Sequence, residues 1–171
     1  MMKTKKLVLM GLFVSMALAL HIVESMIPVP FITPGAKLGL ANIITLTALM
    51  YFGFKDAFII LTVRIILASI FGGGVSAFIY SISGGILSIV FMEIIKLIGK
   101  DNVSLIGISV VGAVFHNIGQ LLAAAFIIKN LKIFVYFPVL FLAGVGTGIF
   151  VGLTSKYLLS FLYKHSPVLK Q

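Results

Sequence analysis

The sequence predicts an all-α integral membrane protein, a single bundle of six transmembrane helices. Of its 171 residues, 61% are hydrophobic and only 10% are charged, whereas a soluble domain carries about 25% charged residues. The apolar residues form long runs, and most of the 13 basic residues lie at the edges of these runs. This composition excludes a soluble globular domain and a disordered chain. It also excludes a nucleic-acid-binding protein, in spite of the formal net charge of +9.

A helix needs about 20 apolar residues to cross the hydrocarbon layer, and the sequence contains six candidate spans. We expect them at residues 7–27, 38–52, 56–71, 75–98, 104–128 and 134–162. Pro28, Pro30, Pro34 and Gly35 follow the first span, and Gly53 and Gly72–Gly74 follow the second and third. The second and third spans are short, which leaves open whether one of them is tilted, broken or not fully spanning. No segment predicts a soluble domain, so residues 1–171 are expected to form one domain.

The beginning of the chain has some features of a signal peptide. Lysines precede an apolar run that contains Ala17-Leu18-Ala19, which resembles a cleavage site. The run continues to Ile27, as a membrane span would. We therefore expect an uncleaved first helix.

The lysines predict the orientation, because cytoplasmic flanks carry the excess of Lys and Arg. With the N-terminus inside, nine lysines lie on inner flanks and three on outer flanks. The inner set is Lys3, Lys5, Lys6, Lys55, Lys96, Lys100, Lys156, Lys164 and Lys170, and the outer set is Lys37, Lys129 and Lys132. The protein is therefore expected to cross the plasma membrane several times, with both termini in the cytoplasm.

Arg64 is the strongest candidate for a functional residue. It is the only Arg in the chain, eight residues into the third span, which places it roughly 12 Å deep at 1.5 Å per residue. Charged groups at such depth are costly and usually mark function or a buried pair. Two interpretations stay open: a binding site for an anion, which we favour, and a structural pair with Glu24 or a helix end.

The fifth span contains three strongly polar residues, His116, Asn117 and Gln120. His116 and Gln120 are four apart and share a helix face, and Asn117 borders that face. Hydrogen bonding between helices would explain such residues. Because the three lie within five positions, we slightly favour a role in lining a cavity.

Polar residues of the first two spans lie at similar depth in the predicted topology. His21 and Glu24 are near the outer end of the first span, and Lys37 and Asn42 flank the beginning of the second. Glu24 could equally be an interfacial residue that reaches toward water. A polar cavity open to the outside would bring all these groups together, with Lys37 and Arg64 facing an anion.

Small residues recur every four positions in three spans. Gly11, Ser15 and Ala19 form such a stripe in the first span, opposite His21 and Glu24. Stripes of this kind let another helix approach closely. Similar sets occur in the sixth and fourth spans, where we favour internal packing: Gly144, Gly148 and Gly152, and Ser81, Gly84, Gly85 and Ser88. Glu93 and Lys96 are expected to form an ion pair at the inner end of the fourth span.

The motifs of enzymes are absent from the sequence. It contains no Asp-rich diphosphate–Mg²⁺ motif, no Gly-x4-Gly-Lys-Ser/Thr, no Ser nucleophile elbow and no His-Glu-x-x-His. It has no Cys, which excludes thiolate metal sites and Cys nucleophiles. We expect no catalytic residue, no metal site and no cofactor, and hence a protein that is not itself an enzyme.

Four segments carry a resemblance to a known family. They are Pro34-Gly35-Ala36-Lys37-Leu38-Gly39-Leu40-Ala41-Asn42; the Arg64 helix followed by Phe71-Gly72-Gly73; Tyr80-Ser81-x-x-Gly84-Gly85; and Gly112-Ala113-x-x-x-His116-Asn117-x-Gly119-Gln120. With them the chain resembles the Gx transporter family, labelled heptaprenyl diphosphate synthase component I, over most of its length. That family is regarded as similar to the substrate-binding S components of energy-coupling factor (ECF) transporters.

The resemblance implies a six-helix membrane protein that captures a micronutrient or precursor from outside. It implies partners as well, namely a transmembrane coupling protein and ATPase subunits that would drive uptake. In S components the first helix commonly presents small residues to the coupling protein, and Gly11, Ser15 and Ala19 are similar to that pattern. A non-catalytic membrane subunit of polyprenyl diphosphate or quinone synthesis is the alternative, and a stand-alone secondary transporter is a weaker one. The substrate stays unnamed, although an anionic or amphipathic molecule fits the predicted site.

Overall fold

The computed structural model describes residues 2–27 and 39–165, and these ranges contain helices and no strand. The α-helices are α1 (Met2–Met26), α2 (Leu40–Phe52), α3 (Phe54–Ala68), α4 (Gly74–Gly99), α5 (Leu105–Ile128) and α6 (Phe137–His165). Three short helical turns lie between them: η1 (Ser69–Gly73), η2 (Lys100–Asn102) and η3 (Leu131–Tyr136). The predicted all-helical fold is confirmed, and each predicted span coincides with one α-helix to within a few residues.

Four of the helices are long and apolar enough to cross a membrane. These segments are Thr4–Met26, Gly74–Gly99, Leu105–Ile128 and Leu131–Lys164, which indicates a multi-pass membrane protein. The helices α2 and α3 have 13 and 15 residues, so they reach only about 20 Å of the roughly 30 Å hydrocarbon layer. The two helices that the sequence marked as short are therefore the two that are too short to span it when upright.

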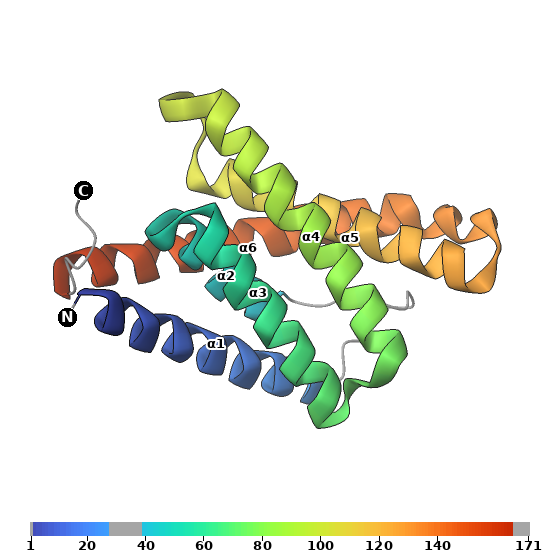
Figure 1. Cartoon of the computed structure of the whole chain (residues 1–171). Helices are drawn as coiled ribbons and strands as arrows, with labels where there is room; N and C mark the ends of the chain where they lie inside the picture. Colours follow the sequence, from blue (N-terminus) through green and yellow to red (C-terminus); the bar gives the residue numbers. More distant parts are fainter. Residues whose placement is uncertain (1, 28–38, 166–171) are drawn as a thin grey trace.

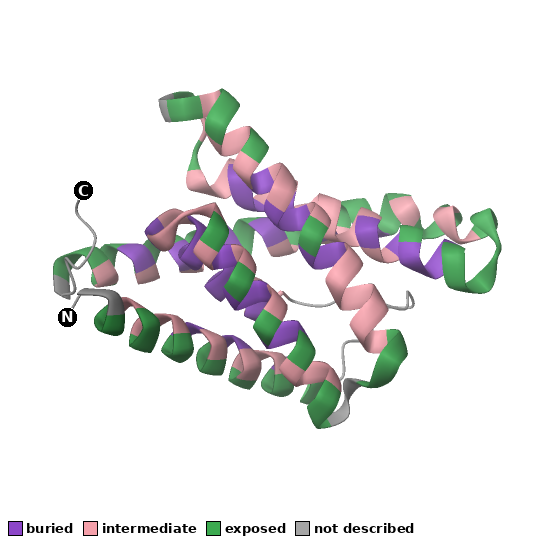
Figure 2. Cartoon of the chain, viewed as in Figure 1, coloured by how far each residue is buried: buried purple, intermediate pink, exposed green. Residues whose placement is uncertain are grey.

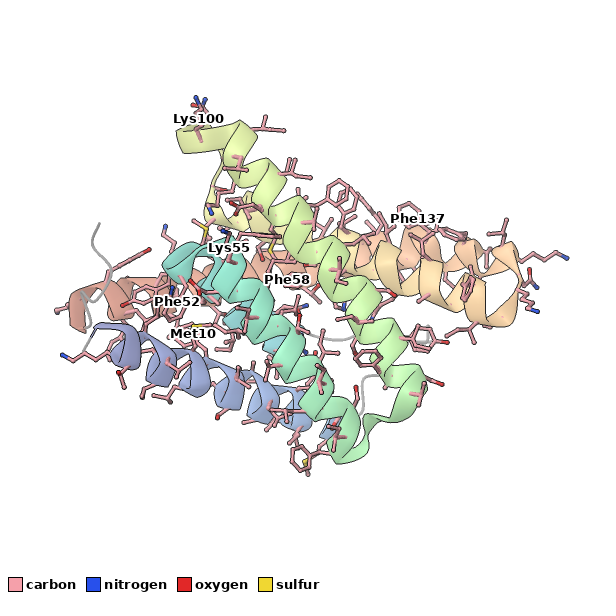
Figure 3. All side chains as sticks on the ribbon, viewed as in Figure 1. Met10, Phe52, Lys55, Phe58, Lys100 and Phe137 are labelled. Carbon is pink, nitrogen blue, oxygen red and sulfur yellow. The ribbon has the colours of Figure 1, made fainter. Side chains whose placement is uncertain are left out.

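Several helix ends lie together on one side of the bundle. Figure 1 shows the beginning of α1, the α2–α3 turn and the end of α6 on the left, and the α5–α6 turn on the right. On the left side Lys6 Nζ lies 2.7 Å from Asp56 Oδ2, and Tyr163 donates a hydrogen bond to the carbonyl of Met50. Lys55 and Lys100, two of the predicted inner lysines, also lie at helix ends on this side (Figure 3). The grouping agrees with the predicted topology, whose absolute orientation stays a prediction.

The centre of the core is the short helix α2. Its residues from Ile43 to Leu49 are all buried, and it packs against α1, α3, α4 and α6. A helix that is surrounded on every side must be apolar all round, and the sequence of α2 meets that requirement. Figure 2 shows the buried residues gathered in the interior, with exposed residues along the outer face of α1.

Glycines allow α4, α5 and α6 to pack in close backbone contact. A Cβ atom at Gly119 of α5 would lie 2.6 Å from the carbonyl oxygen of Ser83 and 2.8 Å from the Cα of Gly84 in α4. A Cβ atom at Gly148 of α6 would lie 2.6 Å from the Cα of Val110 in α5. The prediction that the small residues of the fourth and sixth spans serve internal packing is therefore confirmed for Gly84 and Gly148.

Local signals fix the helix boundaries. Ser104 accepts a hydrogen bond from the backbone N–H of Gly107 and so caps the beginning of α5. Lys129 ends α5 in the left-handed conformation, with φ of 53°. The helix α3 ends at Ala68 rather than at residue 71, because the chain continues as a wider turn to Gly73 before Gly74 adopts a φ of 66°.

Candidate functional site

A polar cavity lies at the centre of the bundle, and all six α-helices contribute to its wall. Its volume is about 40 Å³, which is room for roughly three water molecules. The described lining residues are His21, Glu24, Gly39, Ala41, Asn42, Leu46, Arg64, Ser81, Ser88, Met92, Ser109, Gly112, Ala113, His116, Asn117, Gln120, Thr147 and Val151. Six of the seven residues predicted to bind substrate are in this list. The seventh, Lys37, lies outside the described residues.

The helix α5 supplies one whole face of the cavity. Ser109, Gly112, Ala113, His116 and Gln120 line it together with Asn117, and their spacing of three and four residues is that of a single helix face. A Cβ atom at Gly84 would lie 2.9 Å from the carbonyl oxygen of His116. The glycines of α4 therefore bring the polar face of α5 to the centre of the bundle.

Arg64 is the central charge of the cavity. Arg64 is only 4% exposed, and its Nε has no hydrogen-bond partner. Within the described part of the chain no carboxylate forms an ion pair with its guanidinium. A guanidinium has five N–H donors and is always charged, so this site holds a buried cation whose hydrogen-bonding capacity is largely unused.

Glu24 is buried near the C-terminal end of α1 and lines the same cavity. It is 5% exposed, which excludes the alternative of an interfacial residue that reaches toward water. One carboxylate oxygen accepts a hydrogen bond from the backbone N–H of Gly39, just before α2 begins. Its negative charge attracts Arg64 without reaching ion-pair contact. Glu24 therefore fastens α1 to α2 and lowers the cost of the buried Arg64 charge.

Asn117 has a structural bond as well as a place in the wall. Its side-chain Nδ2 donates to the carbonyl oxygen of Leu140 in α6 at 2.7 Å. Asn117 therefore both connects α5 to α6 and lines the cavity. The amides of Asn42 and Gln120 line the cavity, and no hydrogen bond between either side chain and another described residue occurs.

Sequence reasoning missed the contributions of α4 and α6. Ser81 and Ser88 of α4 and Thr147 of α6 line the cavity, as does Ser109 of α5, whose hydroxyl is buried without a partner. Ser81 belongs to the motif Tyr80-Ser81-x-x-Gly84-Gly85, and Thr147 lies between the glycines of the α6 stripe. Ser81 and Ser88 were assigned from the sequence to a packing stripe, and Thr147 and Ser109 were not considered, so the lining role of all four was missed.

The small-residue stripe of α1 differs from those of α4 and α6. Gly11, Ser15 and Ala19 are all exposed, and a Cβ atom at Gly11 would meet no other atom within 4 Å. Ser15 donates its hydroxyl to the carbonyl of Gly11 and so presents a flat, apolar surface.

The predicted ion pair near the end of α4 is present, with Lys96 Nζ 2.7 Å from Glu93 Oε2.

The cavity is lined by many groups that can form hydrogen bonds. Across residues 2–27 and 39–165 no group of three or more His, Asp or Glu side chains is placed to hold a metal ion. The lining combines one guanidinium, one carboxylate, two imidazoles, three amides and several hydroxyls. Such a set can hold a compact anionic group by hydrogen bonds.

Comparison with known families agrees with this arrangement. A family model described as heptaprenyl diphosphate synthase component I matches residues 13–158. The chain belongs to this family. The match includes α2 to α5, parts of α1 and α6 and every described residue of the cavity, and it confirms the label reached from the sequence motifs. No curated protein and no solved structure matches the chain. The family description names a component of a prenyl diphosphate synthase, which fits a membrane subunit associated with prenyl synthesis.

Proposed function

We propose that this chain is the substrate-binding membrane component of an ECF-type uptake transporter. It captures a small anionic or amphipathic molecule from the outer side of the plasma membrane. The observation that carries the proposal is Arg64, a cation that is 4% exposed on a polar cavity and has an unpartnered Nε. A buried charge of this kind is costly unless a partner of opposite sign completes it.

The other cavity residues have defined parts in the proposal. Arg64 and Lys37 meet the anionic group, and Asn42, His116, Asn117 and Gln120 orient it. Glu24 holds the outer ends of α1 and α2 together through Gly39. No residue carries out a chemical step, and energy for uptake comes from partner ATPases.

The stripe of Gly11, Ser15 and Ala19 is the proposed contact with the transmembrane coupling protein. A Cβ atom at the stripe glycines of α4 and α6 would meet a neighbouring helix, whereas Gly11 has open space in front of it. Those glycines are Gly84, Gly85, Gly144, Gly148 and Gly152. An exposed small-residue stripe in a membrane helix allows a partner helix to approach closely. The opposite face of α1 meanwhile supplies Glu24 and His21 to the cavity.

Ligand retention tests the binding site. The protein is purified in nanodiscs, and the bound small molecules are extracted and identified by mass spectrometry. We expect an anionic compound to be recovered with the wild type and lost with Arg64→Met. Lys55→Met removes an exposed positive charge far from the cavity and is the matched control, which should retain the compound. Equal recovery from Arg64→Met would refute the site.

Partner capture tests the transporter assignment against the alternative that the family description favours. That alternative is a non-catalytic membrane subunit of a prenyl diphosphate synthase. The first function predicts that tagged protein copurifies with identified coupling and ATPase subunits. The second predicts a soluble prenyl synthase whose product length changes when this chain is present.

The position of the partner contact can be tested by the same capture. Gly11→Leu should abolish capture of the coupling subunit, because the larger side chain keeps the partner helix at a distance. Gly146→Leu is the control, since Gly146 of α6 is also exposed and a Cβ atom there would have nothing within 4 Å.

Transport by the chain alone in liposomes would contradict the ECF-type proposal, because that proposal needs partner ATPases, and it would support the alternative of a stand-alone secondary transporter.

A further inference from the structure

A second, larger cavity lies beside the polar one. Its volume is about 320 Å³, and it lies between α4, α5, η3 and the beginning of α6. Its wall is mainly apolar and includes Ala77, Leu121, Ala124, Ile133 and Leu140. No charged residue is among its described lining residues. We refer to it as the apolar chamber.

The apolar chamber and the polar cavity share part of their walls. Ser81 of α4 and Gln120 of α5 line both. Gln120 lies one helical turn from His116 on the same face of α5, and it borders both the polar cavity and the apolar chamber. A molecule that occupies both volumes would pass these two side chains.

The two volumes complement each other in size. Ligand sites for small molecules usually enclose about 300–1,000 Å³, and the polar cavity with its 40 Å³ is far too small to hold a whole metabolite. It suits a compact head group such as a carboxylate. The chamber of 320 Å³ is about twice the 150 Å³ that encloses benzene, so it has room for roughly 12 non-hydrogen atoms.

We infer that the ligand is an amphipathic anion whose head group binds at Arg64 and whose apolar part fills the chamber. This inference rests on the proposed anion-binding function and narrows it to one substrate class, an acid or phosphate ester with a hydrocarbon portion of about ten carbons. A purely polar micronutrient would leave the chamber empty. The alternative occupant, an acyl chain of a bilayer lipid, would not need Arg64.

A chain-length series tests the inference. The probes are butanoate, hexanoate and octanoate, with the matching alkyl phosphates as a second head group and 1-octanol as the neutral control. Affinity for the protein in nanodiscs is measured by calorimetry and corrected for partition into empty nanodiscs. Burying a methylene from water strengthens binding about fourfold at best, and we expect at least roughly tenfold tighter binding of octanoate than of butanoate.

Filling the chamber provides the decisive variant. Ala124→Leu places extra carbons in the chamber and should reduce the octanoate-to-butanoate ratio of affinities to below about threefold. Ala123→Leu is the matched control, because Ala123 is the adjacent residue, has nearly the same exposure (7% against 8%) and lines a different, open groove. It should keep the wild-type ratio.

The outcomes separate this inference from the proposed function. If no acid or phosphate binds the wild type and Arg64→Met retains the same compounds as the wild type, the anion-binding function itself fails. If anions bind through Arg64 with the same affinity at every chain length, the function stands and the inference is overturned. Equal chain-length ratios in wild type and Ala124→Leu, or a phospholipid recovered from the chamber of wild type and Arg64→Met alike, would also overturn it.

Discussion

Replacing Arg64 by Met distinguishes a binding residue from a structural one by the sign of its effect on stability. Met is uncharged, unbranched and similar to Arg in residue volume, so the variant removes the cation and still fills most of the space. If Arg64 holds the fold together, the variant is less stable. If Arg64 is held ready for an absent anion, the ligand-free protein becomes more stable without it.

The magnitude follows from the partners of the guanidinium. Breaking a complete buried ion pair costs about 3–5 kcal/mol, but Arg64 has no ion-pair contact with a described carboxylate, and its Nε is unpaired. The variant forfeits a longer-range attraction to Glu24 of about 1–2 kcal/mol at an effective dielectric constant near 20. It gains back the desolvation cost of the charge, several kcal/mol. We expect a net stabilisation of about 2 kcal/mol, and for a chain of this size an increase in Tm of about 4–8 °C.

The assay is thermal unfolding in one detergent at fixed protein concentration, on preparations shown by mass spectrometry to be free of ligand. Lys55→Met is the control and should shift Tm by no more than about 1–2 °C, because exposed substitutions change stability by about 0.5 kcal/mol or less. A decrease of 5 °C or more for Arg64→Met would show that the guanidinium is structural, and would refute this reasoning.

Three further substitutions test the packing and the local bonds by the same thermal assay. Gly119→Ala should lower stability by about 1–3 kcal/mol, because its Cβ would press on backbone atoms of α4, whereas Gly11→Ala should change Tm little; equal effects would contradict the packing argument. Glu24→Met and Glu24→Gln both lose the charge of Glu24, but only Gln keeps an acceptor for the N–H of Gly39, so Glu24→Met should be less stable than Glu24→Gln by about 1–2 kcal/mol; equal stability of the two variants would exclude the bond. Ser104→Ala should cost about 1 kcal/mol and speed amide hydrogen exchange in the first turn of α5; unchanged exchange would exclude the cap.

The sequence predicted the helices well because each boundary has a local cause. Proline and glycine interrupt the apolar runs, and these residues act through their own backbone preferences. Counting along the helices also predicted that Arg64, His116 and Gln120 lie in the middle or outer half of the membrane, since the rise per residue of a helix is fixed. The same counting placed Glu24 near the outer end of its span, but only the structure shows that Glu24 is buried and bonded to Gly39.

The rest of the site could not be predicted because it depends on which face of each helix turns inward. Ala123 and Ala124 are adjacent and chemically identical, yet one lines an open groove and the other the apolar chamber. Serine is equally ambiguous, since its hydroxyl can return to its own helix backbone. Ser69 does so, donating to the carbonyl of Ile65, whereas Ser109 is buried in the cavity wall with no partner.

The choice of Arg rather than Lys at position 64 bears on the kind of ligand. Lys is a flexible point charge whose pKa falls readily on burial, so a buried Lys can lose its charge. Arg keeps its charge and offers a planar fork that matches a carboxylate or phosphate with two parallel bonds. Arg64→Lys should therefore weaken binding of the anion retained by the wild type by at least about tenfold, the equivalent of about 1.4 kcal/mol. If Lys at this position bound the anion as well as Arg, the guanidinium would act only as a charge, and the geometric argument for a planar acidic head group would fail.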